Sequence, residues 1–284
     1  MRTFVSSAAK VVNIAPDLPT VLIGERINPT GKKKLAAALT AHDLGLAQSL
    51  AVSQVAAGAD ILDVNVGAAG VDEVTMLPQA VRAIQEVADV PLCLDSDNPA
   101  ALSAALKVCE GKPIINSVNG QEERLRQILP LVKEHGAAVI GLALDDEGIP
   151  QDVDRRVAIA MRIVARAEAL GISREDVIID SLALTVAADS RAVLTTLQTI
   201  RRIRDELGVN QTLGASNVSF GLPERDVINV AFLALAIASG VTCPFVHVQK
   251  VRPAVSATDL LLGRDEYAMR YIRQYREREK STRS

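Results

Sequence analysis

The segment that decides the fold spans residues 137–184. It begins with AAVIGLAL (137–144), an apolar run of strand length, and continues through the turn DDEGIP (145–150) into a helical pattern over 152–170. Gly171 ends that pattern, as glycine often does after a helix, and a second apolar run, DVIIDSLAL (176–184), follows. Apolar strands joined by an amphipathic helix predict a βαβ unit whose parallel strands are buried on both faces.

The same alternation extends to both sides of this unit. Periodic stretches predict further helices over 33–57, 73–87, 100–109, 122–135, 191–207 and 227–238. Apolar runs predict further strands in TVLIGE (20–25), ADILDVNVG (59–67), VPLCLDS (90–96), PIINSVN (113–119), residues 211–213 and CPFVHV (243–248). About eight units in a chain near the typical length of ~250 residues favour an α/β fold closed into a single (β/α)8 TIM barrel, with an open doubly wound sheet as the alternative.

We expect one domain over residues 1–284. Residues 1–20 form an N-terminal extension, helical structure continues from the last strand to about Tyr275, and the charged, periodic residues 264–284 form a C-terminal surface helix. With only 2% aromatic residues and no Trp, the core consists of Ala, Val, Ile and Leu. That composition suits a parallel sheet covered by helices.

Charge and composition exclude several classes of function. A net charge of -3 and few stacking aromatics argue against nucleic-acid binding. The first residues make a poor signal peptide, and the longest apolar run, 230–238, is far below the ~20 residues needed to cross a bilayer. Cys93, Cys109 and Cys243 lack metal-ligand spacing and suit reduced core thiols. We expect a cytoplasmic protein without membrane contact.

Carboxylates and amides close most of the predicted strands. They are Glu25, Asn28, Asp63, Asn65, Asp95, Asn116, Asn119, Asp180 and Asn217. In a TIM barrel these positions surround the active site. Histidine and cysteine clusters are missing, which disfavours zinc, iron and histidine catalysis. A Mg²⁺ site at Asp63 and Asp95 stays open, but LIGERINPTGK (22–32) lacks the spacing of a phosphate-binding loop.

Such a ring suits recognition of a flat, polar heterocycle. Carboxylates accept paired N–H donors, and amides both donate and accept, so pterins and purines fit. The alternative is local: Asp often caps the next helix and Asn often forms turns. Gathering of all these residues at one end of successive strands favours the binding interpretation.

Six motifs together resemble the pterin-binding methyltransferases. They are IGERINPTG (23–31), DVNVG (63–67), CLDSDN (93–98), INSVN (115–119), IIDSLAL (178–184) and GASNVS (214–219). This family includes methyltetrahydrofolate:corrinoid protein methyltransferases and the folate domain of cobalamin-dependent methionine synthase. The resemblance implies a TIM barrel, often a homodimer, that binds tetrahydrofolate or 5-methyltetrahydrofolate. A methyl group then passes between N5 of the folate and the cobalt of a corrinoid (cobalamin) on a separate corrinoid protein.

The resemblance also implies roles for individual residues. Asp95, Asn116 and Asp180 match the positions that hold the pterin edge, and Arg225 matches an arginine near the site. Glu25, Asp63 and Asn65 complete the expected substrate-binding ring. Asn217 matches the catalytic residue that hydrogen-bonds near N5. Phe220, Leu222 and Pro223 depart from the family pattern, which has more polar residues there.

The chemistry of N5 explains why an amide at residue 217 is suitable. A tertiary amine is a poor leaving group, and a placed donor lowers the barrier to its departure. An amide can also turn and accept from a protonated N5, so it serves both directions of transfer. Gly214, Ala215 and Ser216 keep the adjoining wall low. Lys32, Lys33 and Lys34 serve either solubility or attraction of an acidic partner or folate tail.

Two other functions remain open at this stage. A dihydropteroate synthase would share the barrel and pterin pocket, and His247, Lys250 and Arg252 resemble its basic last strand. However, GERIN (24–28) and GASNVS (214–219) replace its Asn-rich loop and Lys-bearing strand. A non-catalytic pterin-binding subunit is the other alternative. The physiological direction of methyl transfer is not determined by the sequence, although a second methyltransferase of a demethylation system is favoured.

Overall fold

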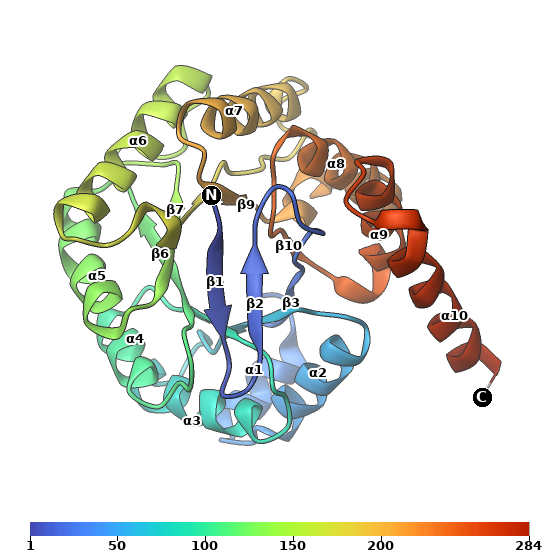
Figure 1. Cartoon of the computed structure of the whole chain (residues 1–284). Coiled ribbons are helices and arrows are strands. Elements are labelled where there is room, and N and C mark those ends of the chain that lie inside the picture. Colours follow the sequence, from blue (N-terminus) through green and yellow to red (C-terminus); the bar gives the residue numbers. More distant parts are fainter. Residues whose placement is uncertain (284) are drawn as a thin grey trace.

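The computed structural model describes residues 1–283, and most of the chain forms a parallel barrel wrapped by helices (Figure 1). The sheet has the strand order β10-β3-β4-β5-β6-β7-β8-β9, so neighbours in the chain are neighbours in space. Its strands are β3 (Ile23–Ile27), β4 (Ile61–Asn65), β5 (Leu92–Asp95), β6 (Ile114–Asn119), β7 (Ala138–Leu142), β8 (Val177–Asp180), β9 (Asn210–Thr212) and β10 (Phe245–Val246).

Backbone hydrogen bonds between the two end strands complete the barrel. Phe245 N donates to Leu213 O at 3.0 Å, and Thr242 N donates to Gln211 O at 2.9 Å. The ends of β9 and β10 therefore meet, and the predicted TIM barrel is confirmed over the open sheet.

Helices join and follow the strands, and all but the last, α10, form the outer ring. They are α1 (Lys33–Thr40), α2 (Gly45–Ala56), α3 (Glu73–Gln85), α4 (Pro99–Leu106), α5 (Glu122–His135), α6 (Val153–Ala169), α7 (Ala192–Glu206), α8 (Arg225–Ser239), α9 (Val248–Leu261) and α10 (Met269–Arg283). Helix α5 has the predicted bounds and ends at Gly136, whose φ of 59° is left-handed and therefore favours glycine. Within residues 1–283, no helix combines the length and apolarity needed to cross a membrane.

Two predicted helical stretches are interrupted. The single helix expected over 33–57 is wrong: α1 ends at Thr40, His42 has a φ of 55°, and Asp43 Oδ1 accepts from Gly45 N at 2.9 Å before α2 begins. Residues 41–44 contain neither glycine nor proline, so the usual sequence signals of a helix end are missing at this turn. The C-terminal helical region is likewise divided, because the chain turns between α9 and α10.

An N-terminal hairpin lies across one end of the barrel (Figure 1). Strands β1 (Thr3–Ser6) and β2 (Val11–Ile14) pair antiparallel, and their inward side chains Val5, Val12 and Ile14 join the cluster inside the barrel. That cluster includes Ile23, Ile61, Cys93, Ile114, Ile178 and Cys243, from the starts of the strands or just before them. The hairpin therefore closes the amino-terminal end, and the site lies at the opposite end.

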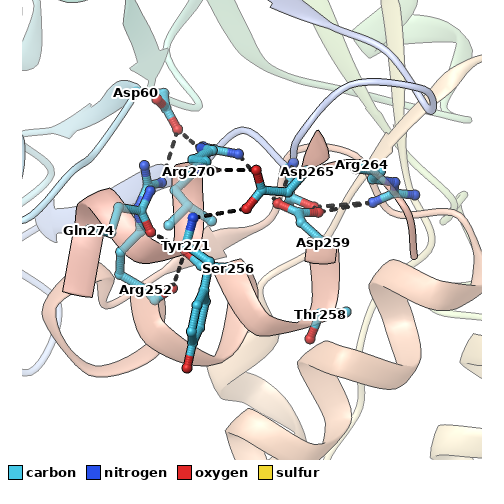
Figure 2. Close-up of polar contacts among 12 residues, drawn as sticks. Asp60, Arg252, Ser256, Thr258, Asp259, Arg264, Asp265, Arg270, Tyr271 and Gln274 are labelled. Carbon is cyan, nitrogen blue, oxygen red and sulfur yellow. Dashed lines mark hydrogen bonds and ion pairs between the residues drawn. The ribbon is translucent and has the colours of Figure 1, made fainter. Parts of the chain in front are cut away.

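The C-terminal helix is attached through a buried acid (Figure 2). Asp259 is 2% exposed and accepts from Thr20 N at 2.9 Å and Thr20 Oγ1 at 2.6 Å. Arg264 and Arg270 approach its two oxygens at 3.3 and 3.5 Å. The network joins the segment before β3 to α9 and α10, which projects from the barrel in Figure 1.

Candidate functional site

Strand register brings the amides and carboxylates of β4, β5 and β6 together. Asn65 is paired with Asp95 across the ladder, and Asp95 with Asn116. Asn65 Nδ2 donates to Asp95 Oδ2 at 2.9 Å, whereas Asn116 Nδ2 lies at 3.5 Å from Asp63 Oδ1. Four of the predicted site residues therefore form one polar cluster at the carboxyl ends of the strands.

The carboxyl groups of this cluster are difficult to ionise. Asp63 is 3% exposed, and its pKa lies well above the ordinary value because of burial and, secondarily, the charge of Asp95. Burial also raises the pKa of Asp95 to about 6, against the hydrogen bond from Asn65. A ligand that supplies N–H donors would favour the ionised forms.

Asp180 stands across the barrel at the end of β8. Burial raises its pKa to about 7, although the hydrogen bond from Leu182 N to Oδ1, at 2.7 Å, acts in the opposite direction. No hydrogen bond to Oδ2 is found within residues 1–283. One carboxylate oxygen is thus available at the barrel mouth.

Arg156 supports the loop after Asp180 and was not predicted. This arginine is completely buried in α6 and donates to the carbonyls of Pro150, Ser181 and Leu182 at 2.7–2.9 Å. It therefore fixes the loop that follows β8 and adds positive charge near Asp180. Its spacing from Ile159, Ala160 and Ile163 places it on the apolar face of α6, which is the sequence signal that could have identified it.

Asn217 lies on a short 3-10 turn, η2 (Ala215–Ser219), rather than on the strand itself. Its side chain is exposed, and its amide makes no hydrogen bond to the part of the chain that the structure describes. A Cβ on Gly214 would approach Asn217 Nδ2 to 2.9 Å. The glycine therefore gives the amide room to fold back over the turn.

A bulge in β3 places Glu25 at the mouth. Gly24 pairs with Leu62 and Ile27 with Val64, so β3 has one residue more than its neighbour between these pairs. A bulge of this kind re-aims side chains. Glu25 Oε1 accepts from Ser216 Oγ at 3.0 Å, which links β3 to η2.

Arg225 braces the same turn from the start of α8. It donates from Nη2 to Ser216 O at 2.8 Å and from Nε to Ser219 Oγ at 3.0 Å, and its guanidinium lies 5.9 Å from the ring centre of Phe220. The structure therefore places Arg225 beside Asn217, in a supporting position.

Two of the amides that were predicted to close the strands form hydrogen bonds within their own loops instead. Asn28 Oδ1 accepts from Thr30 N, and Asn119 Oδ1 accepts from Gln121 N, both at 2.9 Å, which are Asx-type turns. His247 is not on the last strand as expected but occupies the N-cap position of α9, without a side-chain capping hydrogen bond. Among residues 1–283, no group of three or more His, Cys, Asp and Glu is arranged to hold a metal ion.

The three cysteines are free thiols, and burial raises the pKa of each, to about 12 for Cys109 and Cys243.

A closed (β/α)8 barrel with buried acids and amides at its carboxyl end belongs to the class of TIM-barrel proteins whose polar residues are placed where such barrels carry their active sites. The sequence comparisons identify the particular family. Residues 24–247 match the family model described as pterin binding enzyme. The chain belongs to this family, as its motifs predict.

Two curated relatives carry methyltransferase or synthase names. Methionine synthase of Mycobacterium tuberculosis is 34% identical over 262 residues, which are 88% of this chain but 22% of that protein. The chain thus spans about a fifth of that relative's length. Methylcorrinoid:tetrahydrofolate methyltransferase of Eubacterium limosum is 29% identical over 265 residues, which are 90% of this chain and 96% of that protein.

Solved structures of similar fold include dihydropteroate synthases. The enzyme of Xanthomonas albilineans in complex with 7,8-dihydropteroate has a TM-score of 0.67 and 22% identity, covering 91% of this chain and 98% of its own. The Yersinia pestis enzyme with a pterine-sulfa conjugate has a TM-score of 0.68 and 18% identity, covering 93% and 100%. At these identities the likeness shows the barrel fold alone.

Proposed function

We propose that this chain is a methyltransferase that moves a methyl group between N5 of tetrahydrofolate and the cobalt of a corrinoid on a separate protein. The observation that carries the proposal is that an exposed Asn217 amide, with no hydrogen-bond partner in residues 1–283, lies at the same end of the barrel as a set of buried acids. Support also comes from the relative named methylcorrinoid:tetrahydrofolate methyltransferase, which matches along 96% of its length.

The buried acids and amides would hold the pterin ring. The amino-pyrimidine edge of a pterin presents adjacent N–H donors, and a carboxylate accepts such donors well. Asp180 Oδ2 can accept a hydrogen bond from the ligand, and Asp95 and Asn116 lie in register on neighbouring strands. Asp63, Asn65 and Glu25 would fix the positions of these groups or meet the ring directly. Binding would replace water around buried carboxyl groups with hydrogen bonds, which offsets their desolvation.

Asn217 would act at N5. As a methyl group leaves, electron density develops on N5, and a donated hydrogen bond stabilises it. In the reverse direction the amide oxygen can accept from a protonated N5. A bound corrinoid would supply the cobalt that exchanges the methyl group, and the small residues Gly214 and Ala215 leave that approach open. We favour transfer from a methylcorrinoid to tetrahydrofolate, as in a demethylation system, and a homodimeric, cytoplasmic enzyme.

An anaerobic assay of methyl transfer between 5-methyltetrahydrofolate and reduced cobalamin tests the proposal. We expect turnover, and we expect Asn217→Ala to reduce kcat by about a hundredfold while folate affinity changes little, because it removes a transition-state hydrogen bond. Dihydropteroate formation from a pterin diphosphate and p-aminobenzoate should be measured in parallel. Synthase activity without methyl transfer, or full activity of the Asn217 variant, would contradict the assignment.

A further inference from the structure

A pocket of about 250 Å³ opens beside the barrel mouth. Its walls come from the end of β3, from η2 and from the beginnings of α8 and α9. It shares Glu25 and Ser216 with the mouth, and these two residues are hydrogen-bonded at 3.0 Å. The volume is below the ~300 Å³ of the smaller pockets that hold whole ligands, so the pocket suits part of a ligand.

Three cationic side chains line this pocket, and one of them is unpaired within residues 1–283. Lys250 Nζ contacts Asp226 at 2.8 Å, and Arg225 donates to Ser216 and Ser219. The Arg26 guanidinium makes no hydrogen bond or ion pair to any other group in the described chain, although its backbone N donates to Gln54 Oε1 at 2.9 Å. The β3 bulge therefore presents a half-buried cation without a partner.

His247 adds a neutral polar group to the same pocket. Its Nδ1 is buried and has no hydrogen-bond partner within residues 1–283. Burial, then the nearby charges of Arg26 and Lys250, lower its pKa, which favours the neutral imidazole. A buried ring nitrogen of this kind is satisfied by a ligand group or a water molecule.

We propose that this pocket binds the carboxylate-bearing p-aminobenzoylglutamate tail of the folate, with Arg26 and Lys250 facing its carboxylates and His247 at its polar groups. The inference rests on the proposed function. The tail of a folate is attached at the ring carbon next to N5, so a folate with N5 at Asn217 directs its tail past the adjacent Ser216. Ser216 is the wall that the pocket and the mouth share.

Arg26→Gln is the sharpest variant, because it removes the unpaired cation and leaves the Lys250–Asp226 pair intact. Dissociation constants should be measured for 5-methyltetrahydrofolate, its triglutamate and 6-methyltetrahydropterin, which has the ring without the tail. Wild type should prefer the tailed ligands. In the variant, the ratio of the dissociation constants for the tail-less and tailed ligands should fall about tenfold, as expected for the loss of a hydrogen bond to a charged group. Its affinity for the tail-less pterin should be unchanged.

Lys250→Gln, alone and combined with Arg26→Gln, tests the second cation. Arg201→Gln, on the exposed side of α7, is the matched control and should behave as wild type. A tail preference that survives in the double variant overturns the proposal. Equal wild-type affinity for folate and tail-less pterin, together with binding of inorganic pyrophosphate, also overturns it and indicates a diphosphate site. Loss of methyl transfer with an intact tail preference would instead contradict the proposed function alone.

Discussion

Replacing Asp180 by asparagine should weaken folate binding while stabilising the protein without ligand. Asp180 is 8% exposed, and burial raises its pKa from 3.8 to about 7. Asparagine keeps an oxygen at the position that accepts from Leu182 N, but it carries no charge at any pH. The substitution therefore removes the ionisation of the buried group and preserves its shape.

The size of the effect follows from the two pKa values. The carboxyl ionises near its ordinary value in the unfolded chain and only near about pH 7 in the folded chain, so the unfolded state binds fewer protons between these values. Stability is therefore fully present below about pH 4 and is lost as pH rises toward about 7. Since each tenfold change in proton affinity is worth about 1.4 kcal/mol, wild type loses about 2 kcal/mol by pH 5.5 and about 4 kcal/mol above pH 7.

Urea denaturation of wild type and Asp180→Asn at several values between about pH 4 and pH 8 measures this difference. The variant should be more stable by about 2–4 kcal/mol at the upper end, and the difference should close toward the lower end. Folate affinity should fall by at least about tenfold, because a charge-assisted hydrogen bond is lost. Asp146→Asn, in the exposed turn before α6, is the control and should show no pH-dependent difference.

Two separate outcomes would refute the reasoning. An Asp180→Asn variant that is less stable than wild type near pH 8 would show that Arg156 compensates the buried charge in the free protein. Unchanged folate affinity would show that the available oxygen of Asp180 does not meet the pterin.

Two further substitutions test other parts of the structure. Gly214→Ala should slow methyl transfer by about ten- to a hundredfold, because the new Cβ would lie 2.9 Å from Asn217 Nδ2 and displace the amide. Single-turnover kinetics measure this rate. A slower rate with normal folate affinity would support the reasoning, and a wild-type rate would contradict it. Asp259→Ala should destabilise the protein by about 3–5 kcal/mol, because it leaves two arginines and Thr20 without their buried acceptor. Thermal unfolding measures this loss, with Asp146→Ala as the control, and equal melting temperatures would show that the network is dispensable.

The regular part of the fold could be predicted from the sequence. Apolar runs of strand length, helical periods and glycine stops give βα units, and α5 has its predicted bounds at both ends. The polar residues that end β4, β5 and β6 could also be placed at one end of the barrel, because parallel strands end on the same side. These features depend on local periodicity, which a single sequence contains.

Other features depend on contacts between distant segments. The hairpin β1–β2 forms because Val5, Val12 and Ile14 meet the barrel interior, and its short strands resemble any extended terminus. The bulge in β3, which aims Glu25 and Arg26, arises from the register with β4. Likewise, the conformation of Asn217 depends on the room at Gly214. No periodic pattern in a sequence indicates such contacts. The polar residues at the barrel mouth could therefore be predicted, but the hydrogen bonds among them could not.

The arrangement of acids at the mouth is itself an argument for a ligand. Asp63, Asp95 and Asp180 are placed where burial raises the pKa of each, and none of them forms an ion pair within residues 1–283. A fold selected only for stability would pair such groups with cations or replace them with apolar residues. Destabilising groups gathered at one end of a barrel are typical of functional sites. Hydrogen bonding to N–H donors is a chemistry that such carboxyl groups can perform.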